Sequence, residues 1–409
     1  LKINRTKNAK LGTLTYFDQL FSCNFDHIFQ DSLPTITKIF SLGRFLGVSS
    51  YGCNLFFAWT VIVFCLLLTI EFVSIWKFVR LLTGVAINTI GNRGLIGRLS
   101  GSIFYGNALL SLVFSIKFVA TWKNLSCYWI TVDSVRGLNL PLDVRIRRKI
   151  VLVSVFIAIL EHILSMISAT GLDIPITQWF HQYILNSHGF LMQTYEYNIY
   201  AAIAIFIISK VATMLWNFQD LIVIVVSMAL TSRYHKLNMY VQQIVRYENK
   251  TRDLEKLGTD IYIQSQVWRR VREAFVRQAA LVRQVDLDLG PLILLSNVNN
   301  FYFICLQLYM GIGHLKGELI HTIYFFSSLG WLLFRACSVV LAASDVNIHS
   351  KRALAMLYKC PGSGYNIEVK RLINQLSNDS VALSGMGLFN LNRQLILQFN
   401  QLFRSKLNL

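Results

Sequence analysis

The sequence predicts an all-α protein whose helices cross a membrane several times. Hydrophobic residues make up 54% of the 409 residues, whereas charged residues make up only 15%. Soluble domains average about 25% charged residues, so this composition excludes an ordinary soluble enzyme and a disordered chain. The chain has only five prolines, which favours long, unbroken helices. The expected fold class is therefore a polytopic helical membrane protein.

Six stretches of the chain are apolar and long enough to cross the bilayer. A crossing of about 30 Å of hydrocarbon takes roughly 20 residues. The six predicted spans are residues 54–78, 99–122, 150–172, 195–230, 289–312 and 319–346. The fourth is too long for one crossing, so we expect its helix to project into water. Pro291 stands at the predicted start of the fifth span, where a helix tolerates proline.

Lys and Arg are distributed unevenly around these spans. Thirty-one lie in the amino-terminal segment, the second and fourth connections and the tail, and four lie in the other connections. Because cytoplasmic connections carry such an excess, the amino terminus is predicted to be cytoplasmic and the protein to lie in the plasma membrane. This orientation is opposite to that of G-protein-coupled receptors. The net charge of +18 is therefore explained by the basic residues of the predicted cytoplasmic segments. No nucleic-acid partner is expected.

These patterns divide the chain into five predicted segments. They are a cytoplasmic amino-terminal segment (1–53), spans one to four (54–230), a cytoplasmic helical anchor connection (231–288), spans five and six (289–346) and a cytoplasmic carboxyl-terminal segment (347–409). Apolar residues recur at helical spacing among arginines in the anchor connection, which predicts an amphipathic helix. They are Trp268, Val271, Phe275, Ala279 and Val282. This helix packs against the fourth helix and a neighbouring subunit, or lies on the inner leaflet.

Motifs for catalysis and metal binding are not found in the sequence. The seven cysteines are scattered, and no phosphate-binding loop, zinc-ligand spacing or nucleophile elbow occurs. We therefore expect no enzyme activity, no metal and no cofactor.

Polar and aromatic residues gather in the predicted outer halves of the spans. An ionisable group within a span costs on the order of 3 kcal/mol unless it faces protein or water, so Glu161 and His162 indicate a polar cavity. Carboxylates and amides suit hydroxyls, and flat rings suit the faces of a sugar. The predicted ligand-binding residues are Tyr105, Asn107, Glu161, His162, Tyr197, Asn300, Tyr302, Gln307, Tyr324, Ser327 and Trp331.

A structural interpretation of the same residues stays open. Hydrogen bonds between helices and belts of aromatic residues at the membrane surface also explain them. Three deeper groups, Lys210, Asp220 and Arg335, are expected to be structural or to extend to the inner surface.

Sequence motifs in the second half of the chain carry a family resemblance. They are residues 216–221 (WNFQDL), 296–305 (SNVNNFYFIC), 323–328 (IYFFSS) and 341–344 (LAAS), with Arg335 between the last two. In these motifs the chain resembles insect gustatory receptors, most closely their sugar-receptor branch. The resemblance implies a tetrameric, ligand-gated, non-selective cation channel, homomeric or heteromeric, with seven helices per subunit. Its expected partners are a small tastant, membrane lipid and other subunits.

The end of the chain departs from this family pattern. Family members continue from a segment like residues 381–389 into a seventh, pore-lining span, whereas residues 390–406 are too short in apolar length to cross. We expect either a sequence truncated at this end or a product without its own pore helix. Two other functional classes stay open: a metabotropic receptor, disfavoured by the orientation, and a transporter, disfavoured by the unbroken helices.

Overall fold

The computed structural model is helical throughout nearly all of the residues that it describes. These are residues 32–49, 54–83, 95–133, 160, 163–168, 170, 175–192, 194–251, 261–314, 319–360 and 366–393. Among them, a single isolated bridge between Ser384 and Asn390 is the only β pairing. The predicted all-α fold class is therefore confirmed.

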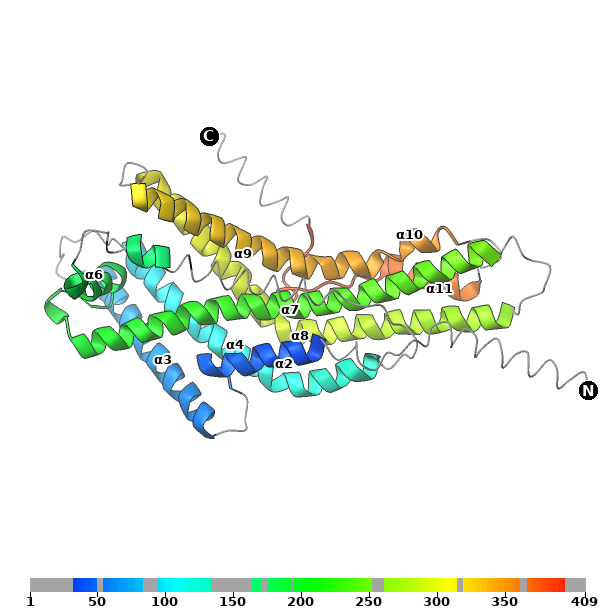
Figure 1. Ribbon diagram of the computed structural model, residues 1–409, viewed down its shortest axis with the longest axis horizontal. Helices are drawn as coiled ribbons and strands as arrows, with labels where there is room; N and C mark the ends of the chain where they lie inside the picture. Colours follow the sequence, from blue (N-terminus) through cyan, green and yellow to red (C-terminus); the bar gives the residue numbers. More distant parts are fainter. Residues whose placement is uncertain are drawn as a thin grey trace, which may run out of the picture.

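Five long helices form the body of the molecule (Figure 1). They are α3 (Asn54–Leu82), α4 (Leu95–Asp133), α7 (Ile199–Thr251), α8 (Ile261–His314) and α9 (Leu319–Lys351). All five are long and apolar enough to cross a membrane, and they contain five of the six predicted spans. Of the predicted third span, 150–172, the structure describes only residues 160, 163–168 and 170, and the predicted approach to a seventh span lies outside the described residues beyond residue 393.

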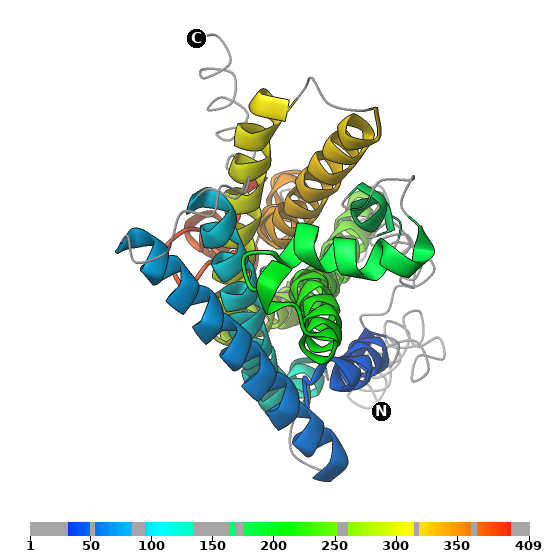
Figure 2. The same cartoon turned by 90° about the vertical axis from the view of Figure 1, so that its left-hand side faces the viewer.

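Shorter helices surround this body. They are α2 (Ser32–Gly43), η2 (Arg44–Leu46), α6 (Ile176–His188), η3 (Thr194–Glu196), α10 (Leu354–Leu357) and α11 (Ile367–Asn378). Figure 2 views the bundle end-on, with α6 lying across the near end of α7.

Helices α7 and α8 extend well beyond the thickness of a bilayer. They contain 53 and 54 residues, which corresponds to a length of about 80 Å each. The predicted projection of the fourth helix is confirmed, and the predicted amphipathic helix continues into the fifth span without a break. Figure 1 shows the later part of α7 and the first part of α8 side by side along the longest axis of the molecule, and the second part of α8 turning towards α9.

The prediction that Pro291 starts a helix is wrong. Pro291 lies in the interior of α8, thirty residues after its first residue, Ile261. A proline there removes one backbone hydrogen bond. The neighbouring residues Leu289, Leu292 and Ile293 are fully buried, so packing on both sides of the proline keeps the helix continuous.

Helix α7 lies at the centre of the bundle and contacts α4, α8 and α9. Helix α3 lies at the edge and exposes large apolar side chains, among them Leu55, Phe72 and Trp76. Since a soluble surface rarely exposes a continuous apolar helix, this face of α3 is suited to contact lipid.

Residues 381–391 fold back along the part of α8 that precedes the predicted fifth span, 289–312. Asp286 accepts hydrogen bonds from the backbone N–H and the hydroxyl of Ser384, at 2.6 and 2.7 Å. A Cβ at Gly290 would lie 3.1 Å from the backbone nitrogen of Met386, so glycine permits this close approach. The contact holds residues 381–391 against α8, next to α11.

Candidate ligand-binding site

The predicted ligand-binding residues fall on three helices and one connection. Glu161 and His162 lie outside the described residues. The other nine are Tyr105 and Asn107 on α4, Tyr197 before α7, Asn300, Tyr302 and Gln307 on α8, and Tyr324, Ser327 and Trp331 on α9.

Four side chains from different helices form a group that we call the outer polar cluster, after the predicted outer halves of the spans: Tyr105, Tyr183, Lys210 and Tyr324. The Lys210 ammonium donates to the Tyr183 hydroxyl at 2.8 Å and lies 4.9 Å from the centre of its ring. The same ammonium lies 4.7 Å from the centre of the Phe206 ring. The phenol groups of Tyr105 and Tyr324 lie near that of Tyr183. The cluster therefore brings two predicted residues together around two that were not predicted.

Helix α9 extends the outer polar cluster along one face. The Tyr324 hydroxyl donates to Ser165 Oγ at 3.3 Å, and one turn further Ser328 accepts a hydrogen bond from Gln307 at 2.7 Å. Trp331 is buried and follows on the same face, because residues three or four apart are neighbours on a helix. Tyr324, Gln307 and Trp331 thus line one continuous strip of the helix bundle.

The remaining predicted residues are not members of the outer polar cluster, although Tyr197 packs against the apolar group that contains Tyr183. Asn107 is two residues from Tyr105, and residues at that spacing point to different sides of a helix. Ser327 is exposed, and Tyr302 packs edge-on against its neighbour Phe303. Tyr197 packs edge-on against His181, with ring centres 4.3 Å apart.

Sequence reasoning missed Tyr183 and placed Lys210 among the deeper structural groups. Lys210 extends its ammonium to α6, so the alternative that it extends to the inner surface is wrong. A signal for α6 exists in the sequence: Trp179, Phe180 and Tyr183 recur at helical spacing in a connection without Lys or Arg. Trp179 and Tyr183 stack in parallel, 5.5 Å apart. An aromatic helix of this kind can close one end of a bundle.

A second polar group, the central ion cluster, lies deeper and consists of Asp220, Ser296, Asn300 and Arg335. The Arg335 guanidinium donates twice to Asp220 Oδ2, at 2.6 and 3.1 Å, and lies 4.4 Å from the Trp216 ring centre. Ser296 and Asn300 donate to the same carboxylate, at 2.5 and 3.5 Å. All four residues are buried.

The central ion cluster joins α7, α8 and α9 at one level. Its carboxylate and guanidinium are exposed by only 5% and 7%, so the pair is isolated from water on all sides. The structural interpretation of Asp220 and Arg335 is therefore the correct one, and neither extends to the inner surface. Asn300, predicted as a ligand-binding residue, belongs to this cluster. Eleven residues of α9, about 16 Å, separate Tyr324 from Arg335.

Comparisons with known proteins identify the family. The trehalose receptor family matches residues 25–401. The gustatory receptor for sugar taste 64a of Drosophila melanogaster is 29% identical over 72% of this chain. The gustatory receptor 5a for trehalose of the same fly is 28% identical over 72% of this chain. The match spans 65% of the length of each of these two relatives.

The fold also has a solved counterpart. The insect olfactory receptor OR5 from Machilis hrabei, solved in complex with eugenol, matches 91% of this chain and 96% of its own, with a TM-score of 0.61 and 12% identity. At this identity the likeness concerns the fold alone. The chain is therefore a multi-pass membrane protein of the trehalose receptor family, with the fold of an insect chemoreceptor.

Proposed function

We propose that this chain is a gustatory receptor subunit in which a sugar, bound at the outer polar cluster, opens a non-selective cation channel. The observation that carries the proposal is the cluster itself: three phenols and an ammonium from four helices converge in a chain of the trehalose receptor family. The fly relatives named for sugar taste and for trehalose support a sugar as the ligand.

The chemistry of the outer polar cluster suits a sugar. An ammonium has three donors, and each phenol both donates and accepts. A sugar hydroxyl therefore finds a partner whether it donates or accepts a hydrogen bond. The ring of Trp179, which stacks on Tyr183, adds a flat apolar surface. Gln307 and Ser328 add an amide and a hydroxyl one turn along α9. We assign Glu161 and His162 to the same site, and Asn107, Tyr197, Tyr302, Ser327 and Trp331 to its surroundings.

Opening follows from a shift between two populations. A sugar opens the channel only to the extent that it binds the open state more tightly than the closed state. The strip of α9 from Tyr324 to Arg335 connects the outer polar cluster to the central ion cluster. A displacement of α9 at the outer polar cluster would therefore change the packing at the central ion cluster. Asn300 acts in this transmission, through its bond to Asp220.

The proposed setting is a homomeric or heteromeric tetramer in the plasma membrane, with a cytoplasmic amino terminus. An antibody against residues 32–49 should stain cells only after permeabilisation. Staining of intact cells would reverse the orientation and place the outer polar cluster on the cytosolic side.

Patch-clamp recording of trehalose-evoked current tests the function. The chain is expressed alone and together with a fly relative. Tyr324→Phe should raise the half-maximal sugar concentration at least fivefold, because the variant loses the hydroxyl that binds Ser165. Tyr200→Phe removes the same hydroxyl from a side chain that is 80% exposed, and should leave the dose-response unchanged. Equal curves for both variants, or uptake of labelled trehalose without current, would contradict the proposal.

A further inference from the structure

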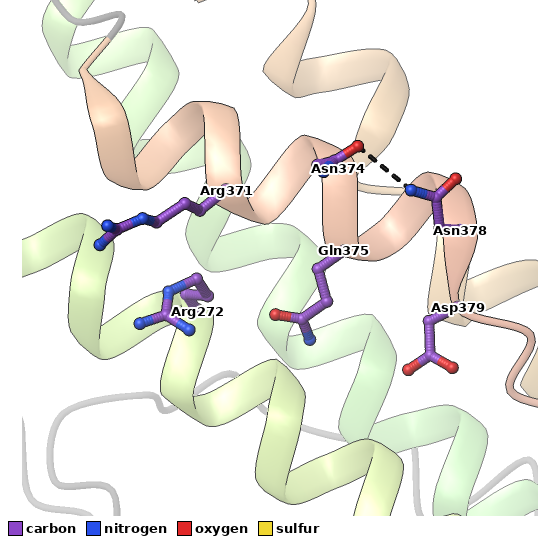
Figure 3. A pocket seen from close by; sticks show the side chains of 6 residues that line it. All are labelled: Arg272, Arg371, Asn374, Gln375, Asn378 and Asp379. Atoms are coloured by element: carbon purple, nitrogen blue, oxygen red, sulfur yellow. Dashed lines mark hydrogen bonds between the residues drawn. The ribbon is translucent and has the colours of Figure 1, made fainter.

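A polar groove lies between α8 and α11, far from the outer polar cluster. Its volume is about 620 Å³. Its lining side chains are Arg272, Arg371, Asn374, Gln375, Asn378 and Asp379, and every one of them is polar. Figure 3 shows Arg371, Gln375 and Asp379 reaching from α11 and its carboxyl end toward α8, where Arg272 faces them. Because all of these side chains have polar or charged ends, the groove favours a hydrophilic ligand.

The fold of α11 presents this polar face. Val369, Leu372 and Leu376 are buried and hold the helix against the bundle. The groove residues Arg371, Asn374, Gln375 and Asn378 recur at steps of three, one and three residues, which places them on one side of the helix. The amide of Asn378 donates to Asn374 Oδ1 at 3.1 Å, so part of this row is already ordered.

Glu368 positions the two arginines at one end of the groove. Its Oε2 accepts from Arg272 Nε at 2.8 Å, and its Oε1 accepts from Arg371 Nη1 at 2.6 Å. A guanidinium has five donors, and each of these two binds Glu368 through one nitrogen, so further donors face the groove. Two positive charges against one carboxylate leave this end with a net charge of +1. It is suited to a phosphate, which guanidiniums bind through paired hydrogen bonds.

The rest of the groove suits hydroxyls. Amide side chains offer both donors and acceptors, and Asp379 at the far end is already paired with Arg283. An aromatic ring that could stack on a nucleobase is not among the lining residues. The lining therefore favours a phosphorylated polyol over a nucleotide.

The position of the groove favours a soluble ligand over a lipid headgroup. Arg272 precedes Leu289, where the predicted fifth span begins, by 17 residues, which is about 25 Å along α8. The headgroup region of a bilayer adds only about 5–7 Å beyond the hydrocarbon. A headgroup held in the membrane would not extend to Arg272.

We propose that the groove between α8 and α11 binds a soluble phosphorylated polyol, with its phosphate on Arg272 and Arg371 and its hydroxyls on the amides of α11. This site is separate from the sugar site and does not depend on it. The ligand class is that of sugar phosphates and inositol phosphates.

Calorimetry on the purified chain in detergent tests the site, with inositol 1,4,5-trisphosphate as the probe. We expect saturable binding of the probe and none of unphosphorylated inositol. Arg371→Gln should weaken binding at least tenfold; its side chain is 60% exposed, so the variant should fold. Arg277→Gln removes an equal charge from an exposed position of α8 outside the groove, and should change the affinity less than twofold.

Three outcomes would overturn the proposal. One is the absence of binding at millimolar probe, and another is an equal loss in both variants, which would indicate attraction to net charge alone. The third is binding only to vesicles that contain phosphatidylinositol 4,5-bisphosphate, which would assign the phosphate to a lipid. None of these outcomes bears on the sugar-evoked current, so the two proposals fail separately.

Discussion

The central ion cluster and the Arg272–Glu368–Arg371 group use the same chemistry in different surroundings. In both, a carboxylate joins helices by accepting hydrogen bonds from guanidinium groups. Asp220 and Arg335 are exposed by 5% and 7%, whereas Glu368 is exposed by 8% and its partners Arg272 and Arg371 by 27% and 60%. Water therefore screens the second group and does not reach the first.

This difference decides what each group contributes. Two charges removed from water cost several kcal/mol each, which their mutual attraction offsets only while both are present. A pair whose guanidinium stays in contact with water costs less to form, and pairs at the surface contribute about 0–1 kcal/mol. The central ion cluster thus fixes one arrangement of α7, α8 and α9, whereas the Arg272–Glu368–Arg371 group keeps donors available for a ligand.

The largest effect is expected from breaking the central ion cluster on one side. Arg335→Gln leaves Asp220 buried without its charge partner and should lower the free energy of unfolding by about 3–5 kcal/mol. Thermal unfolding in detergent measures the change. The double variant Asp220→Asn with Arg335→Gln removes both charges and should recover at least half of the loss. If the double variant is as unstable as the sum of the single ones, the two side chains are not coupled.

A smaller effect is expected at the Arg272–Glu368–Arg371 group. Glu368→Gln removes the carboxylate between two guanidiniums and should cost about 1–2 kcal/mol, because the variant also leaves the two positive charges close together. Hydrogen exchange of the α11 amides measures the local change. Glu273→Gln on the exposed face of α8 is the matched control. Unchanged protection of α11 in the Glu368 variant would show that the apolar face of the helix alone holds it.

The pH dependence sharpens the same comparison. The hydrogen bonds from Arg272 and Arg371 lower the pKa of Glu368 below its ordinary value of 4.5. A carboxyl with a lowered pKa stabilises the folded chain fully above pH 4.5, and this contribution disappears as the pH falls through the lower, folded value. The difference in melting temperature between the wild type and Glu368→Gln should therefore shrink below pH 4.5. A difference that stays constant down to pH 3 would rule out this ionisation.

The smallest effect is expected at an ion pair on the exposed surface of α8. Arg269 and Glu273 lie one turn apart on α8, with side chains exposed by 58% and 43%. Arg269→Gln should change stability by about 0.5 kcal/mol or less, because such pairs are weak in water. Thermal unfolding at low and high salt should detect no difference beyond this amount. A loss above 1 kcal/mol would mean that the pair is shielded by a neighbouring subunit.

The outer polar cluster shows where sequence reasoning reaches its limit. Tyr105, Gln307 and Tyr324 could be selected because aromatic and amide side chains in apolar spans are costly unless they have partners. The aromatic spacing of α6 could indicate a helix that contains Tyr183, but not the contact of Tyr183 with Lys210, which lies on another helix. Asn300 was selected as a ligand-binding residue, yet its partner Asp220 lies on another helix.

The sequence alone determined the helical, membrane-crossing class of the fold, the positions of five long helices and the projection of α7. These features depend on apolar length and on periodicity along the chain, which are local properties. The tertiary structure decided which side chains meet: Asp220 with Arg335, Tyr183 with Lys210, and Glu368 with Arg272 and Arg371. Such pairs depend on the rotation and register of one helix against another, and these are set by the packing of the whole bundle.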